Sequence, residues 1–152
     1  MSWLISIAVL IAILATAEDL RRRTISNKTT AGAFALGLAA QTALYGLSGL
    51  GSSLAGTAAG FFVFLIFFLL GGMGGGDIKL MAGFGAIVGL SRILQAALLT
   101  AIVGALFALG YLLVRKIRGK PGAQDQNKAA EPEAIPYAPA ISLGVLLSFA
   151  AG

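Results

Sequence analysis

The feature that most limits the possible folds is a series of long apolar blocks that carry no charge. The first covers residues 1–17, and comparable blocks follow at 30–47, 54–70 and 93–114. As helices, segments of this length approach or exceed what is needed to cross a bilayer core of roughly 30 Å. Charged residues make up only 11% of the chain, whereas soluble domains carry about a quarter. The sequence therefore predicts an all-α, polytopic membrane protein.

Two weaker blocks complete the predicted bundle. Residues 78–90 are apolar and end at Ser91-Arg92, and residues 134–152 form a block with prolines near its start. Proline is tolerated in the first turn of a helix, so the last block is still expected to span. The first block lacks the basic start and small-residue cleavage site of a signal peptide, so we expect it to remain as a helix. We predict a single domain, residues 1–152, with six transmembrane helices, a turn at Ser48–Ser53 and cytoplasmic loops at about 18–29, 71–77 and 115–133.

The distribution of basic residues predicts the orientation. Six spans place all but one of the basic residues on one side, and only Arg92 on the other. Basic loops favour the cytoplasm, so we expect both termini outside and the site facing the cytoplasm from the inner membrane. Topology and anionic lipid headgroups account for the net charge of +5, so no nucleic-acid partner is expected. The basic residues of the cytoplasmic side are Arg21, Arg22, Arg23, Lys28, Lys79, Arg115, Lys116, Arg118, Lys120 and Lys128.

The chain contains no cysteine and no histidine. This excludes disulfides, thiol nucleophiles, cysteine–histidine zinc sites and histidine general bases. Any chemistry must come from carboxylates, hydroxyls, lysines or the backbone. We expect neither a cofactor nor a metal ion.

A glycine-rich run, Gly71-Gly72-Met73-Gly74-Gly75-Gly76-Asp77, separates two apolar blocks and ends in an acid. A carboxylate beside lipid costs roughly 3 kcal/mol or more, so it marks a functional site by default. Asp77 and Arg92 are 15 residues apart, which is only about 22 Å of helix. We therefore expect the loop to dip below the cytoplasmic interface into a sheltered, wet pocket.

A second carboxylate is expected at the same interface. Glu18 and Asp19 end the first apolar block on the side where Asp77 lies. Two carboxylates held a few ångströms apart share a proton and titrate as a pair. Such a pair can activate water with one member and protonate a carbonyl with the other, which is aspartic-protease chemistry.

Each part of this arrangement also has a purely structural interpretation. Asp77 can be a helix N-cap, and Asp19 can pair with Arg22 or Arg23 at helical spacing. The glycines can serve close helix packing. A phosphate-binding loop is disfavoured because the run lacks the lysine–serine/threonine pair. Lys79 can be an interfacial anchor.

At these residues the chain resembles the type IV prepilin peptidases, membrane aspartic proteases with a Gly-x-Gly-Asp motif. Gly74-Gly75-Gly76-Asp77 and the following Ile78-Lys79-Leu80 match that motif. The stretch from Asp19 to Asn27 resembles the family's other signature, an acid before a basic stretch and Ile-Pro-Asn, with Ser26 in place of the usual proline. The stretch from Pro136 to Ile141 resembles the start of the family's last helix, so the likeness covers nearly the whole chain.

The resemblance implies roles for individual residues. Asp19 and Asp77 become the catalytic pair, Gly74, Gly75 and Gly76 the active-site loop, and Lys79 a candidate supporting residue. Glu18 is excluded, because its position faces about 100° away from that of Asp19 on a helix.

The resemblance also implies a substrate: the basic leader of prepilins or prepilin-like proteins, cut at the cytoplasmic membrane face. Longer family members carry a cytoplasmic segment with paired cysteines and methylate the new N-terminus. This chain resembles the short forms, so we expect cleavage without methylation, with a Flp-type pilus substrate favoured over an archaeal flagellin.

Two other classes of function stay open at this point. One is a small ion-coupled transporter with Asp77 as a cation site, and the other is a non-catalytic membrane assembly subunit. Both predict that loss of Asp19 leaves function largely intact. The oligomeric state is not predicted.

Overall fold

The computed structural model describes residues 2–70, 73–117 and 137–151, and these form helices with no β-strand among them. The all-α prediction is confirmed for this part of the chain. The helices are α1 (Ser2–Arg22), α2 (Asn27–Leu69), α3 (Gly75–Val88), α4 (Leu90–Ile117) and α5 (Ala138–Ala150).

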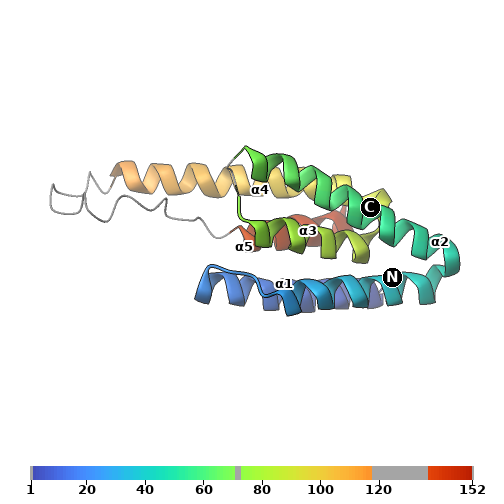
Figure 1. Ribbon diagram of the computed structural model, residues 1–152. Coiled ribbons are helices and arrows are strands. Elements are labelled where there is room, and N and C mark those ends of the chain that lie inside the picture. Colours follow the sequence, from blue (N-terminus) through green and yellow to red (C-terminus); the bar gives the residue numbers. More distant parts are fainter. Residues whose placement is uncertain (1, 71–72, 118–136, 152) are drawn as a thin grey trace.

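Helix α2 is bent sharply at Gly46, where φ is 62° and ψ is −141°. Glycine adopts positive φ without the penalty that other residues incur. The first arm, 27–45, runs beside α1, and the second arm, 47–69, returns on the other side of the bundle (Figure 1). The predicted count of six helices is therefore not confirmed, because the blocks 30–47 and 54–70 both lie in α2. The predicted turn at Ser48–Ser53 is wrong, since those residues are helical and the chain reverses at Gly46.

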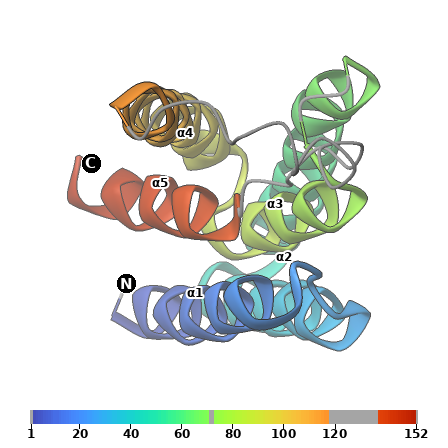
Figure 2. The same ribbon diagram turned by 90° about the vertical axis from the view of Figure 1, so that its left-hand side faces the viewer.

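The helical segments form three layers, seen end-on in Figure 2. One outer layer holds α1 and the first arm of α2, and the other holds α4 and the second arm. Helices α3 and α5 lie between them, and α3 contacts every other helix. The middle layer therefore brings the ends of α3 and α5 against the end of α1.

Helix α3 lies at the centre of the bundle. From Asp77 to its end at Val88, every residue except Lys79 is buried. A helix that is apolar all round is one that neighbours enclose. Leu80 and Phe84 of α3 belong to one core cluster with Ile11 of α1 and Ile141 of α5.

Small residues let α2 and α3 approach closely. A Cβ atom added to Gly56 would overlap the backbone oxygen of Gly85, and one added to Gly85 would overlap that of Gly56. In addition, Ser53 Oγ donates to the Ala86 carbonyl at 2.9 Å, and Gln41 Nε2 donates to the Ile87 carbonyl at 2.8 Å. These bonds supply partners to carbonyls near the C-terminal end of α3, which has few intrahelical donors left.

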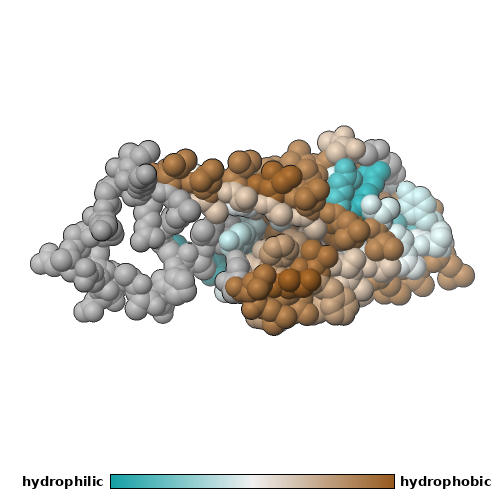
Figure 3. Space-filling model, turned by 90° about the horizontal axis from the view of Figure 1, so that it is seen from above, coloured by the Kyte–Doolittle hydropathy of each residue, from teal (hydrophilic) through white to brown (hydrophobic). Residues whose placement is uncertain are grey.

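The surface is that of a membrane protein. Three segments are long and apolar enough to cross a membrane: Ser2–Arg22, Asn27–Leu69 and Leu90–Gly110. Helices α3 and α5 have 14 and 13 residues, about 20 Å, and are shorter than the bilayer core. Hydrophobic side chains cover most of the face in Figure 3. The start of α1 and the end of α5 lie at the same end of the bundle (Figure 1); whether that end is outside stays a prediction.

The packing of α2 on α3 predicts that Gly56→Ala lowers stability by about 1–3 kcal/mol, because the added methyl group meets backbone rather than a movable side chain. Thermal unfolding of the protein in detergent measures the change. Gly51→Ala, in the same helix, is the matched control. Nothing lies within 4 Å of its added Cβ, so this variant should match the wild type or exceed it. Equal losses in both variants would contradict the packing argument.

Candidate active site

Two buried carboxylates lie where three helix ends meet. Asp19 is in the last turn of α1 and Asp77 in the first turn of α3, and α5 begins beside them. The two residues are only 6% and 8% exposed. Both α3 and α5 present N-terminal ends here, whose unpaired N–H groups and positive dipole ends favour anions. We call this end of the bundle the carboxylate end.

Asp77 is part of a helix rather than the tip of a loop. Helix α3 begins at Gly75 and Gly74 is its N-cap, so the predicted loop 71–77 is too long at its C-terminal side; residues 71 and 72 lie outside the described residues. The Gly74 N–H donates to Asp77 Oδ2 at 3.0 Å, and the Asp77 N–H donates to the Gly74 carbonyl at 3.1 Å. Asp77 is therefore not the N-cap; from the third helical position, its carboxylate accepts the N–H of the N-cap residue.

The glycines around Asp77 differ in their surroundings. A Cβ atom added to Gly76 would lie 3.4 Å from Ile25 Cβ, so Gly76 permits a close approach of the turn between α1 and α2. A Cβ atom on Gly75 would meet nothing within 4 Å. Gly74 and Gly75 are both exposed, so backbone is accessible directly beside the buried acid.

Asp19 is held by the start of α5. Its Oδ2 accepts the Ala138 N–H at 2.9 Å, a bond between residues 119 positions apart. The sequence offered Arg22 or Arg23 only as one possible partner of Asp19, and it did not reveal this amide. The available signal was that the residues after Pro136 start a helix, whose first N–H groups lack intrahelical acceptors.

The electrostatics link the two acids. Burial raises the pKa of Asp77 to about 6, the Gly74 N–H opposes that rise, and the negative charge of Asp19 adds to it. A carboxylate affects the pKa of another in this way only when the two are close. The structure therefore brings Asp19 and Asp77 together, as the dyad hypothesis requires.

Glu18 has a structural role that the sequence reasoning did not find. Its Oε2 accepts the Ser26 N–H at 2.8 Å, and its Oε1 accepts the hydroxyls of Ser26 at 3.0 Å and Thr29 at 2.8 Å. Ser26 also caps α2, since its Oγ accepts the Thr29 N–H at 3.2 Å. Glu18 thereby holds the turn from α1 to α2, next to Asp19. The serine that departs from the family signature supplies an N–H that proline lacks.

Lys79 bonds to Asn27 and not to either aspartate. It is exposed, and its Nζ donates to Asn27 Oδ1 at 3.0 Å, which joins α3 to the start of α2. Within the described residues, no three histidine, cysteine, aspartate or glutamate side chains cluster as a metal site would require. Asp19 and Asp77 each accept a hydrogen bond from a backbone N–H, and the charge of Asp19 acts on Asp77.

Residues 6–109, which include both aspartates, match the type IV leader peptidase family. The chain belongs to this family. A stretch of 103 residues is 31% identical to the prepilin leader peptidase/N-methyltransferase of Bacillus subtilis (strain 168). That stretch is 66% of this chain and 37% of the relative, so the chain spans well under half the length of this curated relative. No solved structure matches the chain significantly. The family that the Gly-x-Gly-Asp motif indicated is therefore confirmed.

The raised pKa of Asp77 predicts how stability depends on pH. The folded state holds the Asp77 proton up to a pKa of about 6, whereas the unfolded state loses it near the ordinary aspartate pKa of 3.8. Stability therefore falls as pH rises through this window, by up to about 3 kcal/mol. Asp77→Asn should abolish this fall, measured as the difference in melting temperature in detergent between pH 4 and pH 8. Asp125→Asn, the same change in the predicted loop 115–133, should leave the fall in stability in place. If the stability of Asp77→Asn still fell between pH 4 and pH 8, burial of Asp77 would not be its cause.

The Glu18 network predicts that Ser26→Ala costs about 1–2 kcal/mol, because it removes the helix cap and the hydroxyl bond to Glu18. Thermal unfolding again measures the loss. Ser6→Ala is the control, since Ser6 is exposed and its hydroxyl bonds only to the Ser2 carbonyl of its own helix. Its effect should stay within about 0.5 kcal/mol. A loss no larger for Ser26→Ala than for Ser6→Ala would show that the network does not hold the turn.

Proposed function

We propose that this leader peptidase family member is a membrane aspartic endopeptidase that removes the basic leader of prepilin-like precursors, Flp-type pilins in particular. Water between Asp19 and Asp77 is the nucleophile. The observation that carries the proposal is that two buried carboxylates lie close enough for one to raise the pKa of the other. Family membership and the relative named as a prepilin leader peptidase supply the reaction class.

In this proposal the two acids have different roles. Asp19, whose Oδ2 accepts a backbone N–H from α5, acts as the base that takes a proton from water. Asp77, whose pKa is about 6, donates its proton to the oxygen of the scissile carbonyl. Hydroxide adds to the carbonyl carbon, and the resulting tetrahedral species collapses as the proton from Asp19 passes to the leaving amine. Asp77 then recovers a proton when the new carboxylic acid forms.

Substrate access is proposed at the exposed backbone of Gly74 and Gly75. These residues present no side chain, and there is open space beside Gly75, so an extended peptide can approach the acids closely. Exposed basic residues, including Arg21, Lys28 and Lys79, lie near the same helix ends. Basic residues favour the cytoplasmic side of a membrane, so the site is proposed to face the cytoplasm.

The central test is cleavage of a leader-bearing prepilin by the purified protein in liposomes. Asp19→Asn and Asp77→Asn should each lower the cleavage rate by about a thousandfold or more, because members of one catalytic unit fail together. Gel filtration and melting temperature check that the variants remain folded. Asp125→Asn should cleave at the wild-type rate. Substantial cleavage by both Asp19→Asn and Asp77→Asn would refute the pair, and no cleavage by the wild type would favour a transporter or an assembly subunit.

The same assay addresses methylation. The proposal is cleavage alone, because the paired cysteines of the methylating family members are absent from this sequence. With S-adenosylmethionine present, the mature product should keep the mass of an unmodified N-terminus. A product heavier by one methyl group would overturn this part of the proposal and leave the peptidase assignment standing.

A further inference from the structure

A pocket of about 300 Å³ opens at the end of the bundle opposite the carboxylates. It lies between the bend of α2 at Gly46 and the junction of α3 with α4 at Gly89, and α1 and α5 contribute one residue each to its wall. In Figure 3, a hydrophilic patch (teal) lies toward this same end of the molecule. None of the residues assigned to the peptidase reaction lines it, so it is a separate feature of the molecule.

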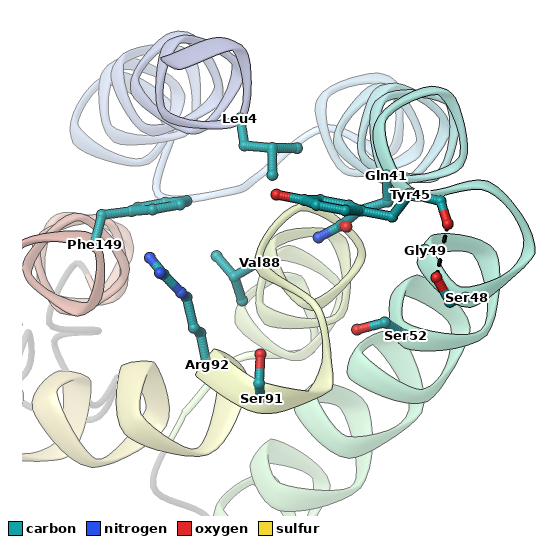
Figure 4. A pocket seen from close by; sticks show the side chains of 10 residues that line it. All are labelled: Leu4, Gln41, Tyr45, Ser48, Gly49, Ser52, Val88, Ser91, Arg92 and Phe149. Carbon is teal, nitrogen blue, oxygen red and sulfur yellow. Dashed lines mark hydrogen bonds between the residues drawn. The ribbon is translucent and has the colours of Figure 1, made fainter. Parts of the chain in front are cut away.

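A guanidinium group with one unpartnered nitrogen lies in this pocket. Arg92 Nη1 is buried and has no hydrogen-bond partner among the described residues. Arg92 Cζ lies 5.6 Å from the centre of the Phe149 ring, a cation–π contact that fixes the plane of the guanidinium but accepts no hydrogen bond. Figure 4 shows the Arg92 side chain extending into the pocket beside Phe149. A buried charged donor left without an acceptor is costly, so an acceptor is expected there.

Further donors face the same space. The hydroxyl ends of Tyr45, Ser52 and Ser91 point into the pocket in Figure 4. Ser52 Oγ accepts the Leu90 N–H at 3.2 Å, so its own proton remains available to a ligand. Helix α4 begins at Leu90, and the positive end of its dipole adds to the field at the pocket.

No carboxylate of the described residues neutralises this set of donors. The described acids are Glu18, Asp19 and Asp77, and all three lie at the carboxylate end. Among its described lining residues the pocket has one guanidinium, several hydroxyl groups and no acid, a combination that favours an anion over a cation. The planar fork of arginine fits two oxygens of a phosphate or carboxylate at once.

We propose that this pocket binds a phosphate-type anion, with Arg92 as its main ligand and the Tyr45, Ser52 and Ser91 hydroxyls as secondary donors. Two aromatic residues at this end, Trp3 and Tyr45, are 72% and 52% exposed, which is typical of the headgroup level of a membrane. The phosphoryl group of an anionic phospholipid reaches this level, and inorganic phosphate offers the same oxygens.

The experiment titrates the purified full chain in dodecyl maltoside with three probes: short-chain phosphatidylglycerol, the matching diacylglycerol without phosphate, and inorganic phosphate. A rise in melting temperature with concentration reports binding. Phosphatidylglycerol, inorganic phosphate or both should bind, and diacylglycerol should not. Binding of the lipid alone identifies a headgroup as the source of the anion, and competition by inorganic phosphate identifies a free-anion site.

Variants connect the binding to the pocket. Arg92→Gln should weaken binding roughly tenfold or more, because it removes the charge and the bidentate geometry. Arg92→Lys keeps the charge, so its affinity should lie between those of the wild type and Arg92→Gln. This variant also provides the test if Arg92→Gln does not fold. Arg21→Gln is the matched control, an exposed arginine at the opposite end, and should bind as the wild type does. Equal affinity of wild type and both Arg92 variants, or no binding of either phosphate-bearing probe, would overturn the proposal.

Discussion

The burial of two carboxylates at one end of an apolar bundle constrains the rest of this structure. Asp19 and Asp77 are withdrawn from water to 6% and 8% exposure, and burial of an ionised acid is unfavourable without compensation. Backbone hydrogen bonds provide this compensation. Asp19 accepts an N–H from the start of α5, and Asp77 accepts one from the start of α3. This arrangement requires three helix ends, distant in the sequence, to meet at one point. The central position of α3 and the packing of α5 against α1 follow from the same requirement.

The neighbouring interactions hold this meeting point. Close contact at Gly56 and Gly85 brings α2 onto α3, and this fixes the level of α3 in the bundle. Glu18, next to Asp19, binds Ser26 and Thr29 and so anchors the turn that follows α1. One glutamate and one aspartate at adjacent positions thus have separate tasks, the first structural and the second proposed to be catalytic. The opposite end of the bundle has the reverse electrostatic character, with Arg92 facing hydroxyl donors.

Much of the fold could be predicted from the sequence, because blocks of apolar residues specify helices through simple length and hydrophobicity. The bend at Gly46 could not, because Ser48–Ser53 has the stronger turn composition, and the contacts of this part of α2 with α3, such as the bond from Ser53 Oγ to the Ala86 carbonyl, cannot be read from the sequence. The two acids could be predicted because charges are rare in this chain and a carboxylate beside an apolar block stands out. Their partners could not, because the Ala138 N–H is backbone, carries no side-chain signature and comes from 119 residues away. The role of Glu18 was hidden for a related reason: its bonds depend on the path of a turn, which helical spacing does not describe.

The central claim is that Asp19 and Asp77 form one coupled site, and a titration of Asp77 tests it most directly. The carboxyl stretching band of Asp77, isolated by infrared difference spectroscopy against Asp77→Asn, reports its protonation as pH is varied. The account predicts a midpoint near 6 in the wild type and a lower midpoint in Asp19→Asn, because the repulsion from Asp19 is removed while burial remains. A wild-type midpoint near the ordinary value of 3.8, or a midpoint that does not move in Asp19→Asn, would contradict it.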